Sequence, residues 1–266
     1  MITSESNTQI KELVKLQKNA RQRKKSKTFV AEGIKLTKEA AMHGKLQRVY
    51  ISEMLHQQQW NGCPECEIAK ELGGAAVEIV AENIFKQISE TVTPQGILGI
   101  VQMPEYSLEE ILSDERNGFL LLDDLRDPGN LGTILRTSEG AGMSGVILSK
   151  ESVDLFNPKV VRSTMGAIFR VPFIYVDDLA ETIEHMKEKG IAVYGTMMEG
   201  SRCYDQVDYR NPVGIVVGNE ANGISQRVGK ALSGRIRIPM EGQLESLNAA
   251  VAAAVVMYEV ARQRRI

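Results

Sequence analysis

From Phe119 to the C-terminus, short apolar runs alternate with longer stretches in which apolar residues recur at helical spacing. Strands that are apolar throughout and separated by helices are typical of a parallel sheet covered on both faces. The C-terminal part is therefore predicted to be an α/β domain, whose ligands bind where loops leave the carboxyl ends of the strands. The predicted strands are residues 119–122, 146–148, 191–194, 215–217 and 236–238, and the predicted helices are 130–141, 178–189 and 246–264.

The first hundred residues predict a second, smaller α/β unit. Amphipathic periodicity indicates helices over 8–19, 33–43, 65–72 and 82–89, and short apolar runs indicate strands at 28–30, 49–51, 77–80 and 97–101. The pattern breaks around Met103, and an acidic stretch follows it. We therefore expect an N-terminal domain over residues 1–105, a linker over 106–117 and a C-terminal domain over 118–266.

Composition indicates an ordinary globular protein. Of the 266 residues, 43% are hydrophobic and 25% charged, which is enough apolar material to bury two cores. The apolar stretch 249–257 is far shorter than the roughly 20 residues that cross a bilayer, and the N-terminus has no secretory pattern. No membrane association and a cytoplasmic location are expected. Cys63 and Cys66 form a CxxC pair in a loop-like context without further ligands, so no metal site is predicted there.

The net charge of −2 conceals an uneven distribution. Residues 1–50 hold twelve Lys/Arg and four Asp/Glu, a net of +8, whereas residues 51–120 hold three and twelve, a net of −9. A solvated helical face would explain the basic end, but so would a polyanionic partner. One short run holds five positively charged residues close together, which favours RNA as the partner. These residues are the predicted phosphate contacts: Arg21, Arg23, Lys24, Lys25 and Lys27.

Polar residues follow the predicted strand 119–122 in the segment Asp123-Asp124-Leu125-Arg126-Asp127-Pro128-Gly129-Asn130-Leu131-Gly132-Thr133-Ile134-Leu135-Arg136-Thr137. Asn130 follows a turn-forming Asp-Pro-Gly and precedes helical spacing, so it is predicted to cap the helix. Arg136 lies about one and a half turns further on. It is either a phosphate ligand or a partner in a surface ion pair.

Two further polar segments follow predicted strands. Gly218-Asn219-Glu220-Ala221-Asn222-Gly223-Ile224 combines a tight turn with a carboxylate that could accept hydrogen bonds. Ile238-Pro239-Met240-Glu241-Gly242-Gln243-Leu244-Glu245-Ser246-Leu247-Asn248 opens the last helix, where Ser246 is a plausible N-cap. Capping does not explain Asn248, because asparagine has no propensity advantage inside a first turn.

Taken together and in this order, the three segments resemble motifs 1, 2 and 3 of the SpoU (TrmH-like) family of RNA 2'-O-ribose methyltransferases over residues 118–264. The stretch Asn157-Pro158-Lys159-Val160-Val161-Arg162-Ser163-Thr164-Met165-Gly166-Ala167 resembles members that act on ribosomal RNA. Phe29-Val30-Ala31-Glu32-Gly33, with the basic run before it, is similar to the L30e-like substrate-binding domain of those members.

The resemblance implies a trefoil-knotted parallel-sheet (SPOUT) domain that binds S-adenosylmethionine and forms a homodimer through this C-terminal domain. It implies that Arg136 contacts the substrate phosphate and hydroxyl, although an arginine pKa above about 12 conflicts with a role as base. The residues implied to orient Arg136, ribose and cofactor are Asn130, Glu220, Ser246 and Asn248. The implied cofactor contacts are Thr196, Gly218, Ile238 and Leu247.

The implied activity is methyl transfer to a ribose 2'-hydroxyl, with large-subunit (23S) ribosomal RNA as the expected substrate. Transfer RNA is the alternative substrate. A Rossmann-type methyltransferase is disfavoured, because the first strand is followed by Asp-Pro-Gly-Asn-Leu-Gly rather than a G-x-G turn. A non-catalytic RNA-binding or ribosome-assembly protein that keeps the fold is the alternative from another class.

Overall fold

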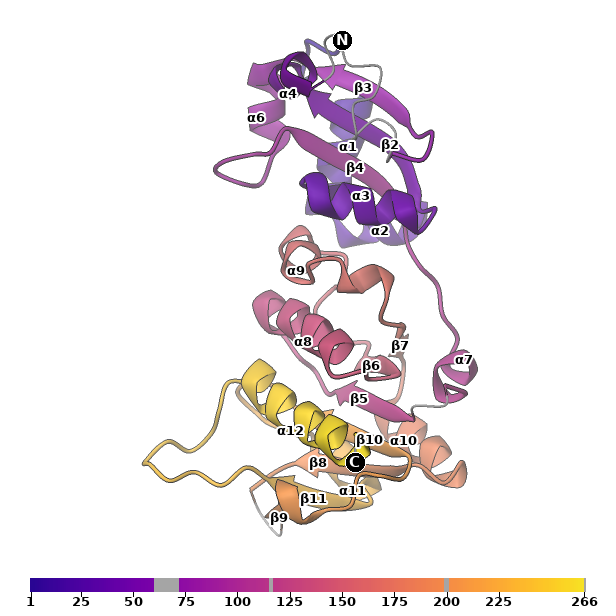
Figure 1. The fold of residues 1–266 in the computed structure, drawn as a ribbon, viewed down its shortest axis with the longest axis vertical. Coiled ribbons are helices and arrows are strands. Elements are labelled where there is room, and N and C mark those ends of the chain that lie inside the picture. The colour runs from indigo at the N-terminus through magenta and orange to yellow at the C-terminus, as the bar shows by residue number, and fades with distance from the viewer. Residues whose placement is uncertain (60–71, 115–116, 199–200, 266) are drawn as a thin grey trace. The chain divides into compact units, whose positions relative to one another are not determined.

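The computed structural model describes residues 1–59, 72–114, 117–198 and 201–265, so the Cys63–Cys66 pair and nearly all of the expected helix 65–72 lie outside the described residues (Figure 1). The chain divides into two compact units. The N-terminal unit comprises Met1–Pro104 and Asp154–Phe169, and the C-terminal unit comprises Glu105–Val153 and Arg170–Ile266. Residues 154–169 were expected within the C-terminal domain. They pack with the N-terminal unit instead.

The N-terminal unit contains a mixed sheet in the order β1-β4-β2-β3. Strand β4 pairs antiparallel with β1 and β2, while β2 and β3 are parallel. The strands are β1 (Thr28–Glu32), β2 (Leu46–Ser52), β3 (Ala76–Val80) and β4 (Ile97–Gln102). The helices are α1 (Thr8–Lys18), α2 (Ala20–Ser26), α3 (Ile34–Met42), α4 (Glu53–Gln59) and α6 (Glu82–Ile88). The predicted elements of this unit are confirmed where the structure describes them, but α2 and α4 were not predicted.

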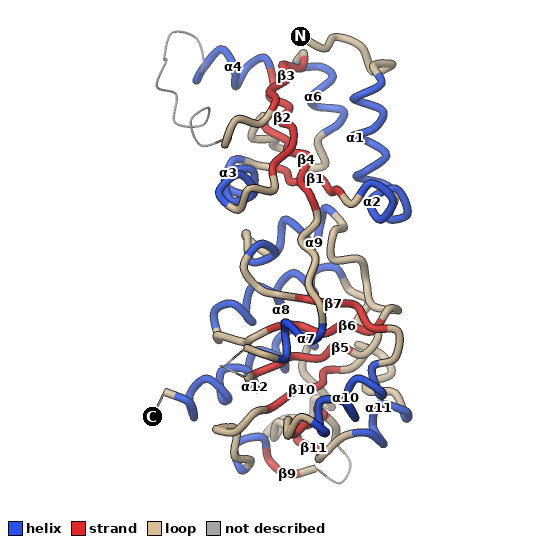
Figure 2. The backbone as a smooth tube through the Cα atoms, turned by 90° about the vertical axis from the view of Figure 1, so that its right-hand side faces the viewer, coloured by secondary structure: helices blue, strands red, loops and turns tan. Residues whose placement is uncertain are grey.

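Alternating side chains of this sheet form two cores. Tyr50 and Leu98 face α1 and α6, where they pack with Leu13 and Phe85. The strand residues next to Tyr50 and Leu98 in sequence point to the opposite face of the sheet, where they pack with α3 and α4. Figure 2 shows these two helix pairs on opposite sides of the sheet. The strand period of two therefore gives each face its own layer of helices.

Residues 154–169 form α9 (Pro158–Ser163) and the 3-10 turn η1 (Ala167–Phe169). Their aromatic rings pack on β1: the Phe29 ring centroid lies 5.0 Å from that of Phe156 and 6.2 Å from that of Phe169. A salt bridge of 3.6 Å joins Arg162 to the buried Glu32 on β1. The motif Phe29-Val30-Ala31-Glu32-Gly33 thus holds this segment in the N-terminal unit.

The C-terminal unit contains a seven-stranded, wholly parallel sheet in the order β7-β6-β5-β10-β8-β11-β9. The predicted parallel sheet is confirmed. The strands are β5 (Gly118–Leu122), β6 (Gly145–Ser149), β7 (Phe173–Val176), β8 (Ala192–Thr196), β9 (Arg202–Cys203), β10 (Val213–Val217) and β11 (Gly234–Arg237). Of these, β7 and β9 were not predicted.

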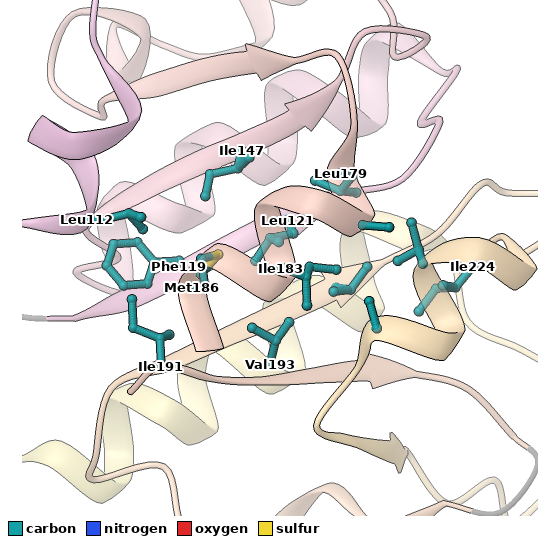
Figure 3. Close-up of a cluster of buried hydrophobic side chains, with 14 of the residues drawn as sticks. Leu112, Phe119, Leu121, Ile147, Leu179, Ile183, Met186, Ile191, Val193 and Ile224 are labelled. Atoms are coloured by element: carbon teal, nitrogen blue, oxygen red, sulfur yellow. The ribbon is translucent and has the colours of Figure 1, made fainter. Parts of the chain in front are cut away.

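Helices cover both faces of this sheet (Figure 2). One face packs on α10 (Leu179–Glu188) and α11 (Gln226–Ala231), with Phe119, Leu121 and Ile183 in the core (Figure 3). The other face carries α8 (Pro128–Gly140) and α12 (Ala249–Arg264), which pack against each other. The short α7 (Leu108–Leu112) precedes β5. Within the described part of the chain, no helix is long and apolar enough to cross a membrane.

Candidate active site

A cavity of about 700 Å³ lies in the C-terminal unit, where loops leave the carboxyl ends of β8, β10 and β11. The first turn of α12 forms another wall of this cavity. This edge of a parallel sheet is where ligands of such folds bind. The lining of the cavity includes every predicted cofactor contact, namely Thr196, Gly218, Ile238 and Leu247. It also includes three predicted catalytic residues, Glu220, Ser246 and Asn248.

Gly218 lets two backbone segments approach each other at the cavity wall. A Cβ atom there would lie 2.2 Å from the carbonyl carbon of Gly223 and 2.3 Å from the nitrogen of Ile224, closer than any real contact. Asn219 and Gly223 exchange backbone hydrogen bonds of 3.0 and 2.9 Å, and Gly223 has a φ of +66°. Only glycine fits at residue 218, so this loop is a fixed wall of the cavity.

Glu220 accepts hydrogen bonds from the segment that follows β5. Its Oε1 accepts from the Asp127 N–H (3.0 Å) and from the Asn130 side-chain amide (2.9 Å), and its Oε2 accepts from the Arg126 N–H (3.1 Å). Burial raises the pKa of Glu220, but these three donors outweigh burial and hold the pKa below its ordinary value. Glu220 is therefore an anion that fixes the loop before α8.

Asn248 continues this connection to α12. Its Oδ1 accepts from the backbone N–H groups of Ala250 (2.9 Å) and Val251 (3.4 Å), so its amide nitrogen is left to donate. That nitrogen donates to Asn130 Oδ1 at 2.9 Å, and Asn130 in turn donates to Glu220. The order Asn248 to Asn130 to Glu220 joins all three sequence motifs, and we call it the amide relay. The helix cap occupies the Asn248 oxygen and the Glu220 carboxylate can only accept, so hydrogen bonds are donated from Asn248 towards Glu220.

Two predicted helix caps are wrong. Helix α8 begins at Pro128, and Asp127 is its N-cap, whose carboxylate accepts from the Asn130 N–H at 2.8 Å. Asn130 lies inside the first turn and is only 8% exposed. Helix α12 begins at Ala249, so Asn248, not Ser246, is its N-cap. The positions of Asn130 and Asn248 are thus explained by side-chain hydrogen bonds between different elements. Such bonds cannot be predicted from any one sequence segment alone.

Comparison with known proteins agrees with this geometry. The model of the SpoU rRNA Methylase family matches residues 117–258, more than half of the chain.

The chain belongs to the SpoU rRNA methylase family.

The MRM3-like substrate binding domain matches residues 7–99. The 23S rRNA (guanosine(2553)-2'-O)-methyltransferase RlmP of Bacillus subtilis (strain 168) is 33% identical over 261 residues, which cover 97% of this chain and 98% of that protein. The AdoMet-bound rRNA methyltransferase from Sinorhizobium meliloti matches with a TM-score of 0.86 and 31% identity, covering 98% of this chain and 97% of that one. AviRb from Streptomyces viridochromogenes, in complex with AdoMet, matches with a TM-score of 0.84 and 25% identity, covering 97% and 99%. The fold of the C-terminal unit is the SpoU methyltransferase fold.

Arg136 lies apart from the other predicted catalytic residues of this SpoU protein. It sits on α8, about 9 Å along the helix axis from Asn130. Its side chain is exposed, does not line the cavity, and makes no hydrogen bond or ion pair with any residue that the structure describes. None of the described side chains occupies this guanidinium, and its role as a substrate contact stays a prediction.

The structure corrects one member of the basic run. Arg23 is 3% exposed and points inward. It donates to the carbonyls of Leu16 (2.6 Å) and Gln17 (2.8 Å) and forms a salt bridge of 2.6 Å with Asp154. Arg23 is therefore a structural residue and not a free phosphate contact. The four others, Arg21, Lys24, Lys25 and Lys27, are exposed.

Sequence reasoning missed several residues that shape the site. Buried Asp123 accepts from the Ser225 N–H at 2.7 Å and ties β5 to the loop after β10. Asp127 caps α8, and Met197, Met198 and Met240 add thioether groups to the cavity wall. The Asp-Pro pair was a usable signal for Asp127, because proline is favoured directly after an N-cap. The methionines carry no such signal.

Proposed function

We propose that this protein transfers a methyl group from S-adenosylmethionine to a ribose 2'-hydroxyl of 23S ribosomal RNA. The observation that carries the proposal is the amide relay beside the cavity, because it brings residues of all three SpoU motifs together. The names of RlmP and of the Sinorhizobium meliloti enzyme support the substrate class and the cofactor.

The cavity fits S-adenosylmethionine. Its volume of about 700 Å³ lies within the usual range for small-molecule sites, and both apolar and polar residues line its wall. Gly218 supplies a surface that any Cβ would disrupt, and Ile238 and Leu247 supply apolar contacts. The hydroxyl of Thr196 already donates to the Val216 carbonyl at 3.1 Å, so this residue would offer mainly its backbone. The bound cofactor supplies an electrophilic methyl group on its sulfonium. The trefoil knot around it remains a prediction.

The residues of the chain have separate roles in this chemistry. Methyl transfer requires the 2'-hydroxyl to be aligned with the methyl group and to lose its proton. Glu220 is a poor proton acceptor, because three donors occupy its carboxylate and its pKa is lowered. The amide relay positions α8 and α12. We assign the contacts with ribose and phosphate to Arg136 and to Ser246, which is exposed at the cavity wall.

We also propose a homodimer through the C-terminal unit and a cytoplasmic location. The small residues Ala250 (4% exposed) and Ala253 (0%) of α12 are buried within the chain and are not available to a partner subunit. Val251 (49%) and Tyr258 (48%), two turns apart on α12, are exposed apolar residues and fit a contact between subunits better. Sedimentation at micromolar concentration tests this, and a fully active monomer would contradict it.

The function is tested in two steps. Isothermal calorimetry should show binding of S-adenosylmethionine, and incubation with labelled cofactor should place methyl groups in ribosomal RNA. Mapping of 2'-O-methyl sites in a deletion strain and its parent then identifies the target. Loss of a site in transfer RNA would favour the alternative substrate. Cofactor binding without methyl transfer to any RNA would favour a non-catalytic assembly protein.

A further inference from the structure

Helix α1 carries a row of three lysines on its solvent face. Lys11, Lys15 and Lys18 are exposed, and none of their side chains has an ion pair or hydrogen bond to a residue that the structure describes. At 100° per residue, their spacing of four and three places them within a sector of about 60°. The opposite face holds Ile10, Leu13, Leu16 and Gln17, which are buried. The helix thus presents cations outward over about 10 Å.

The acidic residue of α1 does not neutralise this row. Glu12 is the helix's single carboxylate, and among the described residues it forms no ion pair with Lys11, Lys15 or Lys18. Residues 8–27 contain eight Lys/Arg and one Asp/Glu. The three lysines are therefore uncompensated positive charge.

Helix α2 extends the basic surface. Asn19 caps both helices, because its N–H bonds to Lys15 at the end of α1 and its side chain accepts from the first N–H groups of α2. Arg23 fixes the corner between the helices through the carbonyls of Leu16 and Gln17. With Arg23 inward, the helical period turns Arg21, Lys24 and Lys25 to the other side, where they are exposed.

The chemistry of this surface points to a phosphate backbone. Residues 8–27 contain no aromatic side chain, so they offer no platform on which unpaired bases could stack. The exposed side of α1 is charged rather than apolar, unlike that of a helix that inserts into a membrane interface. Uncompensated, closely spaced lysines suit phosphates, which release counterions on binding.

We infer that the outer faces of α1 and α2 form one RNA backbone-binding surface, with Lys11, Lys15 and Lys18 as phosphate contacts outside the methylated nucleotide. The inference rests on the proposed function, because it assumes that the substrate is RNA. It adds that this surface binds the RNA backbone through shape and charge, whatever the nucleotide sequence of the RNA.

The test is a triple variant, K11Q/K15Q/K18Q, in the full-length protein. Glutamine has nearly the helix propensity of lysine, so α1 should form. Binding of 23S rRNA transcript and of a duplex RNA of unrelated sequence is measured across a range of salt concentrations. With about 0.7 to 0.9 unit of slope per phosphate contact, the slope should fall by about two to three units for both RNAs. Affinity for S-adenosylmethionine, whose cavity is in the other unit, should not change.

The matched control removes three exposed lysines elsewhere: K86Q/K150Q/K230Q. Lys86 and Lys150 have carboxylate partners at 3.8 and 3.7 Å, so their charge is partly compensated. An unchanged slope in the first variant, or an equal loss in the control, would overturn the inference while leaving methyl transfer by the parent intact. A slope that falls as expected in a protein without methyl transfer would support the surface and refute the proposed function. A parent protein that binds neither RNA overturns both.

Discussion

Replacing Asn248 with serine separates its two roles, because serine caps helices about as well as asparagine but has no amide. The hydroxyl can still accept from the N–H groups at the start of α12. It is too short to replace the amide nitrogen that donates to Asn130 across 2.9 Å. Asn248→Ser should therefore keep the helix and break the amide relay.

The structural cost should be small. The variant loses one neutral hydrogen bond, with a net contribution of about 1 kcal/mol, and leaves the buried Asn130 oxygen without that donor. For a chain of this size, about 1 kcal/mol lowers Tm by about 2 to 4 °C. The catalytic cost should be larger, because a displacement of about 1 Å in a positioning element can reduce the rate about 100-fold. We expect kcat to fall at least about tenfold.

The assay is methyl incorporation into 23S rRNA at saturating cofactor and RNA, with Tm measured alongside. The matched control is Asn7→Ser, because Asn7 caps α1 by accepting from the Gln9 N–H at 2.8 Å and its amide takes no part in the relay. The control should show a similar Tm and normal kcat. A normal kcat in Asn248→Ser would refute the positioning role of the relay, and a large loss of Tm would show that its helix cap had failed.

Three further outcomes are expected. Arg136→Ala should abolish methyl transfer and leave Tm unchanged, since Arg136 has no partner among the described residues; normal turnover would remove Arg136 from the mechanism. Gly218→Ala should lose most cofactor affinity by calorimetry, because its Cβ overlaps the backbone at Gly223, and wild-type affinity would show that the loop can yield. Because the pKa of Glu220 is lowered, its stabilisation is complete above the ordinary carboxyl pKa and is lost as pH falls through the lowered value. Tm of the parent should therefore drop more steeply in acid than that of Glu220→Gln, and parallel curves would contradict this.

Local patterns in the sequence predicted the longer helices and strands and the edge of the sheet that holds the cavity. The apolar runs from Phe119 onward predicted a parallel sheet because burial on both faces leaves no alternation. The carboxyl-end rule pointed to the segments that follow these strands. The resemblance to the SpoU family then singled out Gly218, Ile238 and Leu247, and all three line one cavity. The short strands β7 and β9 escaped prediction because few residues carry too little periodicity.

Only the tertiary structure decided which partner each polar side chain takes. Asn130 and Arg23 illustrate this, since local context suggested a helix cap for Asn130 and a phosphate contact for Arg23. Asn130 is instead buried between Asn248 and Glu220, which lie 118 and 90 residues away in the chain. Arg23 is held by Asp154, 131 residues away, which also brings residues 154–169 into the N-terminal unit. Periodicity and capping rules act over a few residues, whereas a buried polar group must find a hydrogen-bond partner wherever the fold brings one near.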